Sequence, residues 1–168
     1  VSTADASISS VKKGETLEDT IRLLSNYGFD VIVMRHNETG AAQRAANVSR
    51  IPIINAGDGK GEHPTQALLD MYMIWEKFGR LDHLTVSIGG DLTNGRTGRS
   101  LAKILSIYEG NKIKFVSSKE LRIGDDIKDI LRQNRTEFEE TEDMNEALSK
   151  SEVIYWTRIQ KERMENPE

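Results

Sequence analysis

Hydrophobic and polar residues follow two different periods along this chain. Short apolar runs typical of buried strands occur at residues 29–34, 51–54, 84–88, 112–116 and 151–156, with a weaker one at 136–140. Between them, apolar residues or alanine-rich stretches at helical spacing predict helices over residues 16–27, 40–46, 64–78, 96–108, 125–133 and 141–150. Strands that alternate with helices predict an α/β fold with parallel sheets and right-handed crossovers.

A short polar connection, Arg80–His83, marks the expected domain boundary. The helix before it ends at Gly79, a residue suited to a helix C-terminus. We therefore expect two three-layer α/β/α subdomains with parallel sheets, residues 1–79 and residues 80–168. The first part holds only two predicted strands, fewer than a stable sheet needs, so we expect further native sequence upstream.

Composition narrows the possible functions. The chain has 168 residues, with 27 acidic and 23 basic side chains and a net charge of −4, which argues against general nucleic-acid binding. It has no cysteine, and its three histidines are far apart, so we expect neither a thiol nucleophile nor a metal site. No apolar run approaches the ~18 residues that span a bilayer. We therefore expect a cytoplasmic protein that binds no membrane.

The first candidate site lies where a glycine-rich loop, Asn55–Glu62, leads into a helix. Pro64 suits the first helical position, which puts His63 at the cap and Gln66 one turn further on. The unpaired N–H groups of such a helix end attract anions and polarised carbonyl oxygens, and they favour a neutral imidazole that donates a hydrogen bond. The simpler alternative is a capped helix with a surface histidine and glutamine.

Basic residues suggest a further part of this site. Arg35 follows the strand at 29–34, where it can face the His63 helix end, and Arg96 opens a helix after the loop Gly89–Gly98. Cations at a helix start oppose its dipole, so Arg96 is better explained as a fork for a carboxylate or phosphate. The alternatives are a surface ion pair for Arg35 and an ordinary surface arginine for Arg96. The loop does not match the dinucleotide-binding glycine pattern.

The segment before the first helix offers a third group. Ser9, Ser10 and Lys13 precede a helix start, where the lysine opposes the dipole, so they can act as an anion clamp on a mobile loop. The alternative is a solvated charged loop, which is the commoner case for such a pattern.

The amino-acid sequence of the central stretch is more specific for a protein family than the helix start that it predicts. Asn55-Ala-Gly-Asp-Gly followed by His63-Pro-Thr-Gln-Ala-Leu-Leu-Asp70 resembles the carbamoyltransferases, and among them the catalytic chains that use aspartate. The resemblance runs from Ser9 to Arg163, about half of a member's usual length, which implies a fragment that lacks both ends. It implies transfer of the carbamoyl group of carbamoyl phosphate to the amino group of L-aspartate, in pyrimidine biosynthesis, with no cofactor.

The resemblance also implies the roles of individual residues. Arg35, His63 and Gln66 match the groups that hold carbamoyl phosphate, with Arg35 and His63 on its carbonyl oxygen. It also implies two domains. Residues 1–79 match the C-terminal part of a carbamoyl-phosphate-binding domain, and residues 80–168 match the N-terminal part of an aspartate-binding domain.

The remaining matches concern the acceptor and the assembly. Arg96 matches an arginine that takes a carboxylate of aspartate. Ser9 and Lys13 match a loop that reaches a neighbouring subunit's active site, with Lys13 in a catalytic role, which implies a homotrimer with shared sites. A regulatory partner chain is left open.

The chain also departs from the family pattern. The upstream Ser-x-Arg-Thr-Arg and downstream Pro-Leu-Pro-Arg motifs are absent, so we do not expect this fragment to be active by itself. Thr93, Asn94 and Arg99 replace the residues usual in aspartate-specific members. Two alternatives therefore stay open: a carbamoyltransferase for another amine such as ornithine, and a catalytically silent scaffold or oligomerisation relative.

Overall fold

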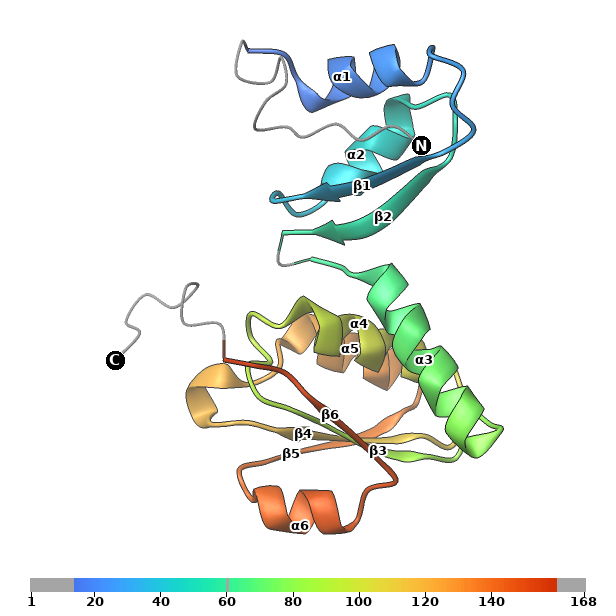
Figure 1. Ribbon diagram of the computed structural model, residues 1–168. Helices are drawn as coiled ribbons and strands as arrows, with labels where there is room; N and C mark the ends of the chain where they lie inside the picture. Colours follow the sequence, from blue (N-terminus) through green and yellow to red (C-terminus); the bar gives the residue numbers. More distant parts are fainter. Residues whose placement is uncertain (1–13, 60, 160–168) are drawn as a thin grey trace. The chain divides into compact units, whose positions relative to one another are not determined.

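The computed structural model describes residues 14–59 and 61–159 and divides into two compact units, Val1–Gly61 and Glu62–Glu168 (Figure 1). Strands and helices alternate along the described part, and every strand pair in it is parallel. The fold class is α/β with parallel sheets, as the hydrophobic pattern predicts. Among the described residues, no helix combines the length and the apolarity that crossing a membrane requires.

The first unit pairs two strands beneath two helices: α1 (Leu17–Leu24), β1 (Ile32–His36), α2 (Ala41–Val48) and β2 (Ile53–Asp58). Helix α2 packs against both strands and α1 packs against α2. Thr16 caps α1, because its side chain accepts a hydrogen bond from the Asp19 N–H at 3.1 Å. Ala41 and Ala45 are fully buried, and their small side chains let α2 lie close to the sheet.

Arg35 lies inside a strand, whereas the sequence pattern predicts that it follows the strand. Strand β1 begins later than expected and includes Arg35, whose residue is exposed. The register runs from Met34 opposite Asn55 to His36 opposite Asp58, so the pairing slips by one residue beside Arg35. Such irregularities bend a strand and re-aim a side chain, and they are common next to functional sites.

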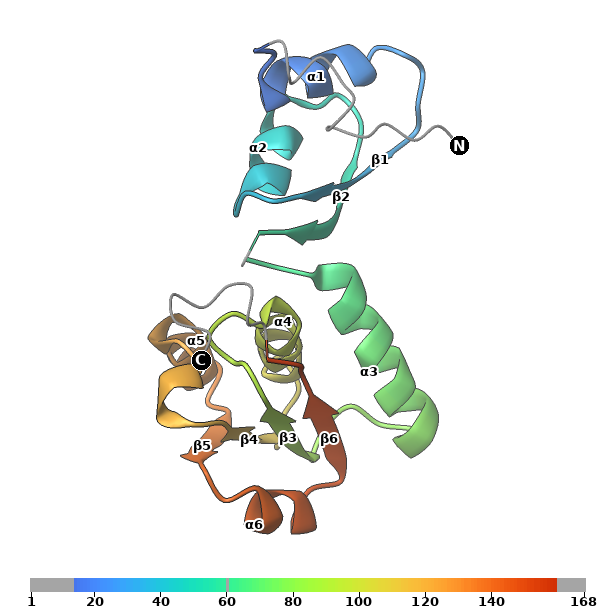
Figure 2. The same ribbon diagram turned by 60° about the vertical axis from the view of Figure 1, so that its left-hand side comes forward.

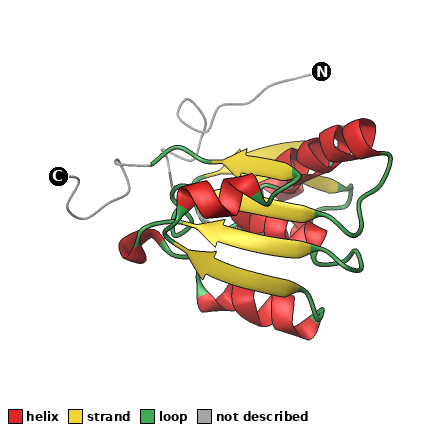
Figure 3. Ribbon diagram, turned by 90° about the horizontal axis from the view of Figure 1, so that it is seen from below, coloured by secondary structure: helices red, strands yellow, loops and turns green. Residues whose placement is uncertain are grey.

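The second unit is a four-stranded sheet with helices on both faces, and its elements are α3 (Pro64–Phe78), β3 (Thr85–Gly89), α4 (Arg96–Leu105), β4 (Lys112–Val116), η2 (Lys119–Leu121), α5 (Asp125–Gln133), β5 (Glu137–Thr141), α6 (Met144–Ser149) and β6 (Val153–Trp156). The strand order is β5-β4-β3-β6, with all strands running in one direction (Figure 3). Helices α4 and α5 lie on one face and α6 on the other (Figures 1 and 2). This confirms the three-layer arrangement for this unit.

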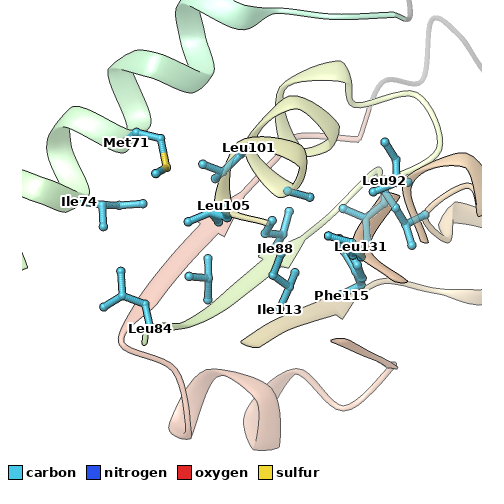
Figure 4. Close-up of a cluster of buried hydrophobic side chains, with 14 residues drawn as sticks. Met71, Ile74, Leu84, Ile88, Leu92, Leu101, Leu105, Ile113, Phe115 and Leu131 are labelled. Atoms are coloured by element: carbon cyan, nitrogen blue, oxygen red, sulfur yellow. The ribbon is translucent and has the colours of Figure 1, made fainter. Parts of the chain in front are cut away.

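The core of this unit lies between the sheet and the helices α3, α4 and α5 (Figure 4). Leu101 and Leu105 of α4 are fully buried against Ile88, Ile113 and Phe115 of the strands. A core packed this densely fixes the carboxyl ends of the strands, and the loops that leave those ends start from a rigid frame.

Helix α3 buries only part of the face that its spacing predicts. That spacing predicts a core stripe of Leu68, Met71, Trp75 and Phe78, with Ala67 and Ile74 beside it. Leu68 and Trp75 are 59% and 51% exposed, whereas Met71 and Ile74 are 4% and 6% exposed. The helix turns Met71, Ile74 and Ala67 inward because it packs against α4. The two compact units divide after Gly61, ahead of α3, and the expected domain boundary at Arg80–His83 stays a prediction.

Candidate functional site

The N-terminus of α3 has the predicted cap. His63 is the N-cap residue, Pro64 follows it in the first turn, and the His63 Nδ1 accepts a hydrogen bond from the Gln66 backbone N–H at 3.3 Å. An imidazole nitrogen that accepts a hydrogen bond carries no proton, so the neutral ring has its proton on Nε2. His63 can therefore offer an Nε2–H donor at the start of α3.

The residue before this cap is fixed to the neighbouring helix. The His63 backbone N–H donates to Ser100 Oγ at 3.0 Å, and the Ser100 hydroxyl donates to the Glu62 carboxylate at 2.6 Å. Lys103, on the same helix α4, forms an ion pair with Glu62. The start of α3 is thereby held against the first turns of α4. Sequence reasoning missed this cluster, because nothing local indicates that Ser100 faces His63.

The Gln66 side chain is also held. Its Nε2 donates a hydrogen bond to Asp70 Oδ1 at 2.9 Å, one helical turn further along α3. Burial raises the pKa of Asp70, while the hydrogen bond from the Gln66 amide and the nearby Tyr155 hydroxyl counteract that rise. Burial likewise raises the pKa of Tyr155, and Thr97 in the first turn of α4 counteracts it.

The loop between β3 and α4 leads directly into Arg96. Asp91 is fully buried and accepts hydrogen bonds from the Asn94 backbone N–H at 2.9 Å and from its side-chain amide at 3.2 Å. Gly90 has a φ of +101°, and a Cβ there would lie 2.1 Å from the Thr157 carbonyl oxygen, so this position needs glycine. Arg96 is the first residue of α4 and is 8% exposed.

The strand order points to a second candidate residue near this loop, Arg158, which is not among the predicted site residues. From β3 the chain steps to β4 and β5 on one side, and it then returns to β6 on the other side of β3. In open parallel sheets, ligands bind beyond the carboxyl ends of the strands at such a switch point. Thr157 directly follows β6, its backbone N–H donates to Gly89 O at 2.9 Å, and Arg158 comes next. Arg96 and Arg158 thus follow the ends of adjacent strands.

The three residues of this region that depart from the family pattern, Thr93, Asn94 and Arg99, make contacts within the fold. The Thr93 hydroxyl donates to the Arg122 carbonyl oxygen at 3.0 Å, and the buried Asn94 binds Asp91. Arg99 forms an ion pair with Asp126 at the start of α5, where its charge is matched. Each substituted residue therefore has a structural role in the described part of the chain.

The second unit holds His63 and Gln66 at the start of α3 and Arg96 at the start of α4, and these two helices pack against each other. Arg35 belongs to the first unit, and Ser9 and Lys13 lie outside the described residues. Among residues 14–59 and 61–159, no group of three or more histidine, aspartate or glutamate side chains is placed to hold a metal ion.

Comparison with known proteins identifies the family. Residues 1–76 match the family described as "Aspartate/ornithine carbamoyltransferase, carbamoyl-P binding domain". The chloroplastic aspartate carbamoyltransferase of Arabidopsis thaliana is 56% identical over 155 residues, which are 92% of this chain and 40% of that protein. The chain belongs to the carbamoyltransferase family. The aspartate carbamoyltransferase catalytic subunit of Methanocaldococcus jannaschii is 47% identical over 167 residues, 99% of this chain and 54% of that subunit.

Solved carbamoyltransferase structures share the fold. The catalytic subunit of M. jannaschii aspartate transcarbamoylase superposes with a TM-score of 0.84 at 48% identity, covering 97% of this chain and 53% of that one. Aspartate transcarbamoylase from Trypanosoma cruzi in complex with aspartate and phosphate gives a TM-score of 0.89 at 40% identity, covering 98% and 55%. The chain thus spans about half the length of the relatives that it matches. The family match ends within α3, so it includes His63 and Gln66.

The comparisons correct the expected location. The relatives from A. thaliana, Pisum sativum and Oryza sativa are named as chloroplastic, which contradicts the expectation of a cytoplasmic carbamoyltransferase. That expectation rested on the absence of cysteine and of long apolar runs, and neither property distinguishes the cytoplasm from the interior of an organelle.

Proposed function

We propose that the protein, in its full native length, transfers the carbamoyl group of carbamoyl phosphate to the α-amino group of L-aspartate, giving N-carbamoyl-L-aspartate and phosphate for pyrimidine biosynthesis. The observation that carries this proposal is the capped start of α3, where His63 offers an Nε2–H donor next to Gln66. The proposal is supported by T. cruzi aspartate transcarbamoylase, a protein similar to this chain, which has been solved in complex with carbamoyl phosphate and with aspartate.

The start of α3 suits the chemistry of carbamoyl transfer. The amine nitrogen attacks the carbamoyl carbon, the bond from that carbon to the phosphate oxygen breaks, phosphate leaves and one amine proton is released. In between, the carbonyl oxygen gains negative charge, and hydrogen-bond donors that are already in place stabilise this charge without reorganising. His63 and Arg35 are the proposed partners of that oxygen, and Gln66 holds the rest of the carbamoyl group.

The switch point between β3 and β6 suits the acceptor. L-Aspartate carries two carboxylates, and Arg96 and Arg158 supply two guanidinium groups after the ends of adjacent strands. Guanidinium groups bind carboxylates through two parallel hydrogen bonds, which fixes the orientation of the acceptor as well as its charge. An acceptor whose side chain carries an amine, such as ornithine, would place a like charge against one of these arginines.

The assembly forms the other part of the proposal. Ser9 and Lys13 act in the active site of a neighbouring subunit, so the functional unit is a homotrimer with shared sites, with which a regulatory chain can combine. Residues 1–79 form the C-terminal part of the carbamoyl-phosphate-binding domain, and residues 80–168 form the N-terminal part of the aspartate-binding domain. This division follows the family match, which ends at residue 76, and it assigns α3 to the first domain.

An assay with a panel of amines tests the proposal. The protein in its full native length is incubated with carbamoyl phosphate and with L-aspartate, L-ornithine or putrescine, and phosphate release and the carbamoylated product are measured. Turnover with aspartate alone is the expected result. Turnover with ornithine would favour the other branch of the family, and no turnover with any amine would favour the silent scaffold.

A further inference from the structure

The hydrogen bond between Gln66 and Asp70 determines which end of the Gln66 amide faces the carboxylate. The Gln66 Nε2 donates to Asp70 Oδ1 at 2.9 Å, and the two residues lie one turn apart on α3, where side chains four positions apart are neighbours. A carboxylate can only accept hydrogen bonds, so the amide must turn its nitrogen toward Asp70. The opposite orientation would place the amide oxygen against carboxylate oxygens.

Fixing the nitrogen of an amide also fixes its oxygen. With Nε2 held by Asp70, the Gln66 Oε1 points the other way within the amide plane and remains an acceptor. Gln66 occupies the third position after the His63 cap, and side chains at these two positions lie on the same side of a helix start. The cap therefore offers one donor, the His63 Nε2–H, and one acceptor, the Gln66 Oε1.

Asp70 is held in an environment that suits this role. Its other carboxylate oxygen, Oδ2, is buried and makes no hydrogen bond of ordinary geometry with the described residues. Tyr155, from β6, lies close enough for its hydroxyl to influence Asp70, and it also interacts with Thr97, the neighbour of Arg96. Asp70 is thus joined to Gln66 by a hydrogen bond and lies near Tyr155 of β6.

We propose that Asp70 is a positioning residue that sets the specificity for carbamoyl phosphate, because it locks the Gln66 amide with its oxygen toward the –NH2 of the carbamoyl group. A carbamoyl group presents a carbonyl oxygen, which accepts, and an –NH2, which donates, and the His63 and Gln66 pair offers the complementary pattern. Acetyl phosphate has the same carbonyl oxygen but a methyl group in place of –NH2. This inference rests on the proposed function, since it assumes that carbamoyl phosphate binds at the start of α3.

The test compares two phosphate substrates on the same variants. For wild type, Asp70→Asn and Asp70→Ala, kcat/KM is measured with carbamoyl phosphate and with acetyl phosphate, and the ratio of the two values is the readout. An unpaired polar group strongly disfavours a substrate that lacks its partner, so the ratio should fall about tenfold in Asp70→Ala. It should fall less in Asp70→Asn, which keeps an acceptor but also permits the reversed amide. Because both substrates are measured on the same preparation, a partly folded variant leaves the ratio unchanged.

Two controls separate this role from a structural one. Asp129→Asn, which neutralises an exposed carboxylate on α5, should leave the ratio unchanged. Gln66→Ala should lower the ratio as far as Asp70→Ala does, and the double variant should lower it no further, because both changes remove the same interaction. Equal losses with both substrates in the Asp70 variants would overturn the proposal. A wild-type protein without carbamoyl transfer activity would instead overturn the proposed function.

Discussion

The His63 Nδ1 accepts a hydrogen bond from the Gln66 backbone N–H at 3.3 Å. This contact caps α3, and it also selects the tautomer of the neutral ring, because the remaining proton must lie on Nε2. A second contact, from the His63 N–H to Ser100 Oγ at 3.0 Å, fixes the backbone from which the ring projects. The donor is therefore oriented by the fold before any substrate arrives.

Arg96→Lys tests the acceptor site. Lysine keeps the positive charge but loses the planar pair of N–H groups, so we expect KM for aspartate to rise about tenfold, with little change in KM for carbamoyl phosphate. The matched control is Arg99→Lys, on the same helix, since Arg99 pairs with Asp126 within the fold. An equal rise of KM for both substrates would argue against a role of Arg96 in acceptor binding.

Mixing two inactive variants tests whether sites are shared. Lys13→Ala and Arg35→Ala proteins are each prepared in full native length, mixed, dissociated and reassembled. If one subunit supplies Lys13 and its neighbour supplies Arg35, some sites in the mixed oligomers contain both residues, and part of the activity should return. Mixed oligomers without any recovered activity would mean that each site is built within one chain.

Asp70→Asn should change how stability depends on pH. Burial raises the folded-state pKa of Asp70 above that of the unfolded chain, so the folded protein binds the proton more tightly. Asp70 therefore adds to the free energy of unfolding at low pH. This contribution declines as the pH rises from the ordinary aspartate pKa through the raised folded-state pKa. We expect Asp70→Asn to be at least as stable as wild type at neutral pH and to lose this part of the pH dependence. Denaturant unfolding at several pH values measures the stability at neutral pH and its dependence on pH. A variant that is less stable than wild type at neutral pH would contradict the expectation.

Local pattern predicted the elements of this carbamoyltransferase chain well. Strand β4 and helix α5 have the predicted bounds, because each is a short segment with a clear period. The inward face of α3 could not be predicted in the same way. Met71 belongs to the same apolar stripe as Leu68 and Trp75, so only the packing against α4 decides that the helix buries Met71 with Ile74 and leaves Leu68 and Trp75 exposed.

The site was predictable where it depends on a helix end. His63 and Gln66 follow from a proline and a glycine-rich loop, which are local signals. The end of the first strand was predicted two residues too early, at Met34 and not at His36, because an apolar run does not fix where a strand ends. Ser100 could not be found, because its contact with His63 depends on helix packing, which no local pattern shows. The place of Arg158 beside Arg96 depends on the strand order, which local pattern does not show either.

The most direct test of the account is a comparison of wild type with His63→Ala, measuring kcat for carbamoyl transfer to aspartate and Kd for inorganic phosphate in full native length. His83→Ala, which removes an exposed histidine, serves as the control. The hydrogen bond from Nε2 strengthens as the carbonyl oxygen gains charge, so kcat should fall by about 10² to 10³, while phosphate binding should change little. Equal losses in kcat and in phosphate affinity would contradict the role of His63 as the donor to the reacting oxygen.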